Sequence, residues 1–129
     1  MTISEVGKKY DISEDTLRWY ERIGLINNVP RKSNGLRDYN EENCRNVEFI
    51  KCMRNAGLSI DFLQQYMNLI KKGDSTLGER KDLLEKEKQI LLKQIDDMKI
   101  TLDRLNFKID HYEKMCADYE SKNNEKDRK

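Results

Sequence analysis

A cysteine between two basic residues is the first feature of the sequence that could do chemistry. Cys52 lies in the stretch FIKCMRNAG, with Lys51 before it and Arg54 after it. A thiolate there could add to an aldehyde or an α,β-unsaturated carbonyl, or be oxidised or nitrosated. The alternative is a structural role, because the pattern puts Cys52 on one helical arc with Phe49, Met53 and Ala56, and a helix C-terminus disfavours a thiolate. The local sequence therefore leaves two interpretations of Cys52, a sensor and a core residue.

A group of basic side chains is the second candidate site. Residues 16–37 hold five of them against the single carboxylate of Glu21, although the net charge of the 129-residue chain is only +1. They are Arg18, Arg22, Arg31, Lys32 and Arg37. A basic segment in a nearly neutral protein indicates a localised anionic partner, although a solvated basic loop is the simpler alternative.

Other chemistries find little support in the composition. The three cysteines are widely spaced without a CxxC pair, and the chain has one histidine, so we expect no disulfide framework, no metal site and no cofactor. No paired carboxylates, nucleophile with a base, or glycine-rich phosphate loop indicates an enzyme. No apolar run approaches the roughly 20 residues of a membrane span. We therefore expect a soluble, cytoplasmic protein that is not an enzyme.

Two short helices joined by a tight turn are predicted at the N-terminus. The capping box TISE predicts a helix over about residues 3–10, and Ser13 caps a second helix that ends before Gly24. This pair is a helix-turn-helix candidate. In residues 25–39, apolar positions flank an SNG turn, so we expect a two-stranded β-hairpin, or wing.

Two further helices complete a predicted domain over residues 1–73. Asn40 opens the first and Gly57 closes it, and Ser59 opens the second, which ends at Gly73. The fold class is therefore mainly all-α with a small β-hairpin wing, in the arrangement of a winged helix-turn-helix domain.

One long helix is predicted over residues 75–121, opened by a second capping box, TLGE. Positions alternating by four and three along it are apolar at ten of eleven sites, Lys88 being the exception. The apolar seam positions are Leu84, Leu91, Ile95, Met98, Leu102, Leu105, Ile109, Tyr112, Cys116 and Tyr119. This stripe needs a partner helix, most simply a second copy, so we expect a coiled-coil homodimer. The polar residues 122–129 are predicted to be a disordered tail.

The second helix has one arc for packing and one arc for contacts. Leu17 and Tyr20 lie on the first arc, while Arg18, Trp19 and Arg22 lie on the second. Arginine presents a forked donor set that suits guanine edges and phosphates, so the second arc suits a major-groove recognition helix. The alternative for both aromatic residues is core packing. Two such helices related by a twofold axis would read an inverted repeat.

The order of these motifs resembles a known family. TLRWYERIGLI, a hairpin ending in GLRDY, FIKCMRNAGLSI and a terminal coil are similar to the mercury-resistance-regulator (MerR) family of bacterial transcription factors over about residues 1–120. The resemblance implies a winged helix-turn-helix domain, an antiparallel coiled-coil dimer, and activation by untwisting a promoter whose spacer is too long for RNA polymerase, which would be an indirect partner. A protein dimer can hold such a deformed duplex through phosphate contacts.

The resemblance also implies which residues contact DNA. The family's contacts fall on Arg18, Trp19, Tyr20, Arg37 and Tyr39, and Trp19 stands where the family usually has tyrosine. Together with the outward arc and the basic wing, the candidate DNA-binding residues are Thr16, Arg18, Trp19, Tyr20, Arg22, Arg31, Lys32, Arg37 and Tyr39.

The absence of metal ligands limits the kind of signal that such a regulator could sense. Metal sensors of the family carry a cysteine where the long helix begins, but here the segment is KGDST, without cysteine or histidine. What remains resembles the aldehyde-responsive subgroup, whose lone cysteine in the third helix has a setting like IKCMRNAGLSI. This resemblance points to Cys52 as a sensor. Lys51 and Arg54 do not face its sulfur, because residues one or two apart on a helix point elsewhere.

Two alternatives stay open. The same DNA-binding regulator could respond to an oxidant, to nitric oxide or to an unknown small molecule. In a different class of function, the chain would be a coiled-coil adaptor that binds protein and whose basic residues are incidental.

Overall fold

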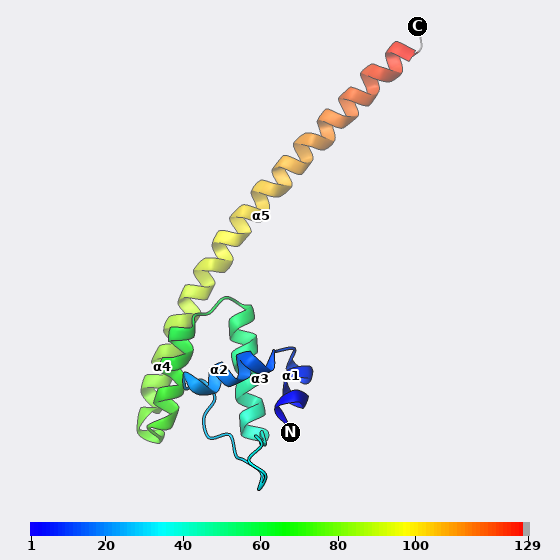
Figure 1. Cartoon of the computed structure of the whole chain (residues 1–129). Coiled ribbons are helices and arrows are strands. Elements are labelled where there is room, and N and C mark those ends of the chain that lie inside the picture. Colours follow the sequence, from blue (N-terminus) through cyan, green and yellow to red (C-terminus); the bar gives the residue numbers. More distant parts are fainter. Residues whose placement is uncertain (128–129) are drawn as a thin grey trace. The chain divides into compact units, whose positions relative to one another are not determined.

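The computed structural model describes the backbone of residues 1–127 and the side chains of residues 1–124 (Figure 1). It consists of two units, Met1–Leu83 and a second unit that begins at Leu84. The helices are α1 (Ile3–Tyr10), α2 (Glu14–Arg22), α3 (Glu41–Asn55), α4 (Ile60–Lys71), the short 3-10 turn η1 (Asp74–Thr76) and α5 (Leu77–Asp127). The mainly helical fold agrees with the prediction. No helix within the described residues is long and apolar enough to cross a bilayer.

Local capping sets where the first four helices begin. Thr2 and Glu5 form the predicted capping box, with the Glu5 N–H donating to Thr2 Oγ1 at 3.1 Å. Ser13, Asn40 and Ser59 each accept a backbone N–H in the first turn of α2, α3 and α4. Each cap satisfies a donor that the helix itself leaves unpaired, so these starts are confirmed as predicted.

The turn between α1 and α2 depends on Gly7. A Cβ at this position would lie 2.7 Å from the carbonyl oxygen of Ile12, closer than real Cβ contacts. The Ile12 N–H donates back to the Gly7 carbonyl at 3.0 Å. Glycine therefore allows the close approach that joins the two helices of the helix-turn-helix.

The first unit has a hydrophobic core of its own, to which α1 to α4 and the segments between them contribute. Its members are Val6, Leu17, Tyr20, Leu25, Ile26, Val29, Tyr39, Val47, Ile50, Leu58, Phe62, Leu63 and Met67. Because the apolar arc of α2 is among them, its opposite arc is left on the surface.

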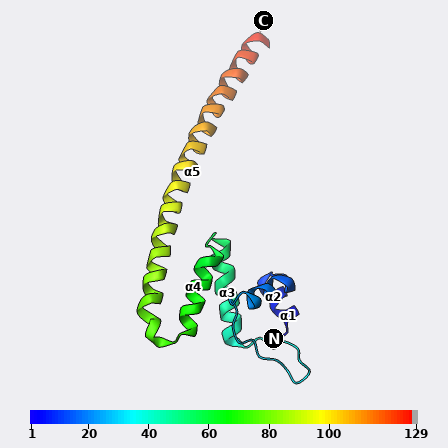
Figure 2. The same ribbon diagram turned by 60° about the vertical axis from the view of Figure 1, so that its left-hand side comes forward.

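The predicted β-hairpin wing is not formed as a pair of strands. The wing segment, residues 27–38, reverses direction with one isolated antiparallel bridge between Arg31 and Arg37. The Asp38 N–H donates to the Pro30 carbonyl at 2.8 Å, but proline has no N–H to return the bond. A two-stranded ladder without a third strand is also marginal. The wing segment is therefore a closed loop, drawn without arrows in Figure 2.

At the junction between α4 and α5, Thr76 bonds to the end of α4, whereas the sequence predicted that it would cap the start of α5. Thr76 is buried, and its hydroxyl donates to the Leu69 carbonyl at 2.6 Å. Arg80 donates from Nε to Thr76 Oγ1 at 3.0 Å and from Nη2 to the Gly73 carbonyl at 2.7 Å. Thr76 thus satisfies the carbonyl end of α4, because these acceptors would otherwise be unpaired.

The helix α5 continues beyond its predicted end. It includes residues 122–127, which the sequence pattern assigned to a disordered tail, while residues 128–129 of that tail lie outside the described residues. The segment contains no proline or glycine that would stop a helix. The division between the two units falls at Leu83 and Leu84, within α5, whereas the predicted domain boundary lies at residues 73–75.

Candidate nucleic-acid interface

The outward arc of α2 presents two arginines and a tryptophan. Arg18, Trp19 and Arg22 are exposed, and Trp19 keeps 41% of its surface accessible. Leu17 and Tyr20 on the other arc are buried. The core alternative is therefore right for Tyr20 and wrong for Trp19. Two bases beside an exposed aromatic ring on one helix arc suit base edges and the sugar-phosphate backbone.

Two of the candidates on α2, Thr16 and Arg18, make side-chain contacts within the chain. Thr16 is half-buried, and its hydroxyl accepts a hydrogen bond from Ser13 Oγ at 2.8 Å beside the helix cap. Arg18 Nη1 donates to Asp15 Oδ1 at 3.0 Å, and the Asp15 side chain is 97% exposed. An ion pair that exposed contributes little, so Arg18 can leave it for a phosphate or a base.

The basic residues of the wing segment differ in how firmly they are held. Arg31 and Lys32 are exposed, and Arg31 Nη1 donates to the Gly35 carbonyl at 3.1 Å. Arg37 is half-buried, and its Nε donates to Glu21 Oε2 at 2.7 Å. This ion pair joins the wing segment to α2. Glu21 was not among the site residues predicted from the sequence. The one sequence feature that could have indicated it is that Glu21 is the single carboxylate in the basic segment.

Tyr39 lies inside the first unit. Only 2% of its surface is accessible, and its hydroxyl is a buried polar atom without a hydrogen-bond partner. Burial raises the pKa of Tyr39, and the nearby Glu21 carboxylate raises this pKa further, while Arg37 and Arg18 oppose both effects. A DNA contact by Tyr39 stays a prediction and requires its hydroxyl to become accessible.

Cys52 is exposed, so the interpretation that placed it on a core arc is wrong. The buried positions of α3 are Asn43, Val47 and Ile50, which leave Cys52 on the opposite side of the helix. Cys116 is also exposed.

The two basic neighbours of Cys52 are engaged elsewhere. Lys51 Nζ donates to the Asp11 carbonyl at 2.8 Å, and Arg54 Nη1 donates to the Leu58 carbonyl at 2.8 Å. Both bases are therefore held at backbone carbonyls rather than at the sulfur. The described residues contain no group of three or more histidine, cysteine or acidic side chains placed to hold a metal ion.

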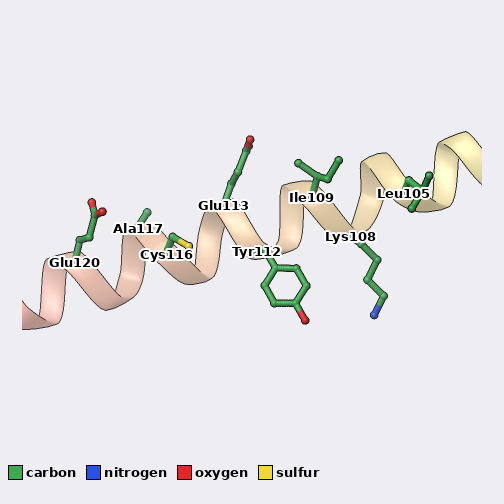
Figure 3. A pocket seen from close by; sticks show the side chains of 8 residues that line it. All are labelled: Leu105, Lys108, Ile109, Tyr112, Glu113, Cys116, Ala117 and Glu120. Carbon is green, nitrogen blue, oxygen red and sulfur yellow. The ribbon is translucent and has the colours of Figure 1, made fainter.

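The seam of α5 is accessible to a partner. Leu91 is half-exposed and the other nine seam residues are exposed, including Leu102 at 55% and Ile109 at 54%. Figure 3 shows part of the seam: Ile109 and Tyr112 lie between Leu105 and Cys116 along the helix, and Lys108 and Glu113 point to opposite sides. This is the arrangement that coiled-coil packing requires, with apolar residues along a line and charges beside it.

Comparison with known proteins assigns the chain to a family. The profile described as "MerR HTH family regulatory protein" matches residues 1–70, and the profile described as "MerR, DNA binding" matches residues 44–106. The chain belongs to the MerR family. It is accordingly a DNA-binding transcriptional regulator, and the resemblance seen in the sequence motifs is confirmed at this level.

Two curated transcriptional regulators are similar in sequence to most of this chain. The HTH-type transcriptional regulator AdhR of Bacillus subtilis is 51% identical over 92 residues, which cover 71% of this chain and 66% of AdhR. An uncharacterised HTH-type transcriptional regulator of Haemophilus influenzae is 31% identical over 116 residues, covering 90% of this chain and 86% of that protein.

Two solved structures of MerR-family regulators are similar to this chain. A putative regulator from Listeria monocytogenes has a TM-score of 0.92 and 41% identity, covering 100% of this chain and 99% of that one. HiNmlR, described as a MerR family regulator lacking the sensor domain and bound to promoter DNA, has a TM-score of 0.81 and 31% identity, covering 90% and 92%. These relatives favour a regulator over the coiled-coil adaptor.

Proposed function

We propose that this MerR-family protein is a homodimer that binds an inverted-repeat operator, activates transcription by distorting an overlong promoter spacer, and responds to reactive carbonyl compounds through Cys52. The observation that carries the DNA part is the division of α2, in which Arg18, Trp19 and Arg22 are exposed while Leu17 and Tyr20 anchor the helix in the core. A helix held from one side and basic on the other is suited to the major groove.

The contacts with DNA divide into two kinds. Arg18 and Arg22 reach base edges or nearby phosphates from α2, and Trp19 packs on a sugar or a thymine methyl group. Arg31 and Lys32, exposed in the wing segment, bind flanking phosphates. HiNmlR, the relative bound to promoter DNA, supports double-stranded DNA as the partner.

The homodimer rests on the exposed seam of α5. Fully burying one large apolar side chain contributes roughly 1.5–3 kcal/mol, and the seam offers such side chains over five heptads. Monomeric soluble proteins rarely expose large contiguous apolar patches, so an exposed stripe over five heptads indicates an interaction surface. A second copy of α5 supplies a matching stripe.

Lys88 favours an antiparallel over a parallel dimer. In a parallel coiled coil each seam residue faces its own counterpart, so Lys88 would face Lys88 of the partner and the two ammonium groups would repel each other. An antiparallel arrangement centred between Leu102 and Leu105 instead places Lys88 against the ring of Tyr119. The alkyl part of lysine can pack there while its charge stays in water.

Charges beside the seam match in the same antiparallel register. With Leu102 packed against Leu105 of the second copy, Lys99 lies beside Glu113 across the interface. The same register pairs Glu87 with Lys122. Opposite charges at these flanking positions select orientation in coiled coils.

Activation by distortion follows from the dimer. Two recognition helices related by a twofold axis hold two half-sites at a separation that the protein sets. Smooth bending of a short duplex by tens of degrees costs on the order of 1–6 kcal/mol, and phosphate contacts from two wing segments can offset it. The strained duplex brings the promoter elements into the spacing that RNA polymerase requires.

Cys52 provides the proposed response. Its sulfur adds to the carbonyl carbon of an aldehyde, a C–S bond forms, and the thiol proton ends on the former carbonyl oxygen, which gives a hemithioacetal. The exposure of Cys52 allows the electrophile to reach it. The new group changes the surface of α3, an element that packs against α1 of the helix-turn-helix.

The sensing part is tested by transcription in vitro from a promoter that the wild-type protein activates. We expect formaldehyde or methylglyoxal to change transcription with wild-type protein and with Cys116→Ala, but not with Cys52→Ala. An unchanged response in Cys52→Ala would exclude Cys52 as the sensor. Mass spectrometry of Cys52 after aldehyde, peroxide or nitric oxide treatment then separates aldehyde addition from oxidation and nitrosation.

A further inference from the structure

The ion pair between Glu21 and Arg37 differs from the other side-chain pairs of the first unit. Both of its side chains are about three-quarters buried, at 23% and 24% exposure, and the N–O distance is 2.7 Å. The Arg18–Asp15 pair includes a carboxylate that is 97% exposed, and the Arg45–Glu41 pair is 4.0 Å long. Only a well-ordered, partly buried pair holds a side chain in one orientation.

The pair joins two separate parts of the candidate DNA interface. Glu21 belongs to the recognition helix α2, and Arg37 belongs to the wing segment at the bridge with Arg31. The wing segment lacks the strands that would otherwise fix it, and the bridge is isolated. The Glu21–Arg37 contact therefore adds a tie between the wing segment and α2 that the backbone ladder does not supply.

The atom that makes the contact leaves the rest of the arginine available. Arg37 uses Nε toward Glu21 Oε2, whereas a guanidinium also carries two terminal nitrogens with four N–H donors. A bidentate phosphate contact uses such terminal donors. Glu21 can therefore orient Arg37 without occupying the donors that a phosphate would take.

We propose that Glu21 is a positioning residue for DNA recognition: it holds Arg37 through Nε, so that the terminal nitrogens of Arg37 bind a phosphate and the wing segment keeps its place beside α2. This proposal rests on the proposed DNA contacts of α2 and the wing segment. It explains the presence of one carboxylate within a basic segment whose partner is a polyanion.

Positioning and simple charge predict opposite results when the carboxylate is removed. If Glu21 acts by charge alone, its removal weakens repulsion of phosphates, and every duplex binds more tightly. If Glu21 positions Arg37, its removal loosens binding to the preferred duplex, because Arg37 and the wing segment lose their orientation.

The experiment compares two duplexes and four variants of the full-length chain. One duplex is enriched by the wild-type protein from a randomised pool, and the other has the same bases in shuffled order. The variants are Glu21→Gln, Glu14→Gln, Arg37→Ala, and Glu21→Gln combined with Arg37→Ala. Glu14 is exposed on the same helix, so its variant is the control for charge.

We expect Glu21→Gln to lower the affinity ratio between the enriched and shuffled duplexes about tenfold, the effect of one hydrogen bond to a charged group. Glu14→Gln should leave this ratio unchanged. In the Arg37→Ala background, Glu21→Gln should cause no further change in this affinity ratio, because the partner of Glu21 is absent. Thermal midpoints of all variants distinguish a loss of positioning from a loss of folded protein, which would move the midpoint.

Other outcomes would overturn the proposal. If Glu21→Gln tightens binding to both duplexes as Glu14→Gln does, Glu21 acts by charge alone. Arg37→Lys gives a second check, since it keeps the charge but cannot hold Glu21 through Nε while it binds a phosphate with two nitrogens; a wild-type ratio in this variant would also contradict positioning. If the wild-type protein enriches no inverted repeat, the proposed function fails, and this inference fails with it.

Discussion

The two units of this MerR-family protein use apolar side chains in opposite ways. In the first unit, residues such as Leu17 and Leu63 are fully buried in one core. In the second unit, Leu102 and Leu105 remain 55% and 56% exposed along a single helix. The first unit therefore buries its hydrophobic residues within one chain, whereas the second leaves its seam residues exposed, where the proposed homodimer would cover them.

This contrast has a thermodynamic consequence. Folding of the first unit depends on contacts within one chain. The free energy of unfolding of the monomer should therefore not depend on protein concentration. In the proposed homodimer, association through the seam would stabilise the protein by mass action, so this contribution should rise with protein concentration.

The largest effect is expected from a charge placed in the seam. Leu102→Asp should convert the dimer to monomers, because an unpaired carboxylate would be buried against Leu105 of the second copy. Loss of the linked second site should lower affinity for an inverted-repeat duplex by about a thousandfold. Sedimentation velocity and duplex titration measure the two effects.

Ile100→Asp is the matched control for the seam variant. Ile100 is 54% exposed, nearly the same as Leu102, but it lies on the side of α5 opposite the seam. This variant should remain a dimer with wild-type affinity. Equal effects of Ile100→Asp and Leu102→Asp would argue against the seam as the dimer interface.

A core truncation in the first unit should have the next largest effect. Leu17→Ala removes a fully buried side chain of α2 and should lower the free energy of unfolding by about 3 kcal/mol, within the range for such cavities. Leu36→Ala, at a 61% exposed position of the wing segment, should change it by less than about 0.5 kcal/mol. Urea denaturation at one fixed protein concentration compares them.

Charge reversals beside the seam should have a smaller effect and test its orientation. Lys99→Glu and Glu113→Lys should each weaken dimerisation by about 0.5 kcal/mol, and the double variant should restore the wild-type dissociation constant. A parallel coil would not place these two residues together, so an additive double variant would contradict the antiparallel register.

The smallest effect is expected from removing the Tyr39 hydroxyl. Tyr39→Phe deletes a buried hydroxyl that has no hydrogen-bond partner, so the free energy of unfolding at neutral pH should change by less than about 1 kcal/mol. A loss of more than about 2 kcal/mol would show that this hydroxyl is paired.

The alkaline behaviour of the same variant has a definite sign. Burial raises the pKa of Tyr39 in the folded state above its ordinary value of 10.0. The contribution of the neutral Tyr39 hydroxyl to the free energy of unfolding is therefore fully present below pH 10, and it is lost as the pH rises above that value. Between neutral pH and about pH 11, Tyr39→Phe should therefore lose less stability than the wild type. Tyr10→Phe, which keeps Tyr39, should show the wild-type alkaline loss.

Helix positions could be predicted from the sequence because their determinants are local. The caps at Thr2, Ser13, Asn40 and Ser59 act within one helical turn, and the glycine that follows α3 has the positive φ of a helix end. The wing failed as a prediction because strand pairing needs reciprocal hydrogen bonds, which Pro30 cannot complete.

The position of Cys52 could not be predicted for a different reason. Phe49, Met53 and Ala56 predicted a core arc around it. Phe49 and Met53 do pack against the core at half-buried positions, but the buried arc of α3 runs through Val47 and Ile50 and leaves Cys52 exposed. Which arc of a helix is buried depends on the neighbouring elements, and the sequence pattern shows only which arcs could be buried.

The sequence by itself determined the family, the helix order, the packing arc of α2 and the apolar seam of α5, because capping and periodicity act over a few residues. Only the tertiary structure decided that Cys52 is exposed, that Tyr39 is buried, and that Glu21 meets Arg37. These facts depend on contacts between residues distant in the chain, 16 residues apart for the ion pair, and such contacts are selected by how whole elements pack.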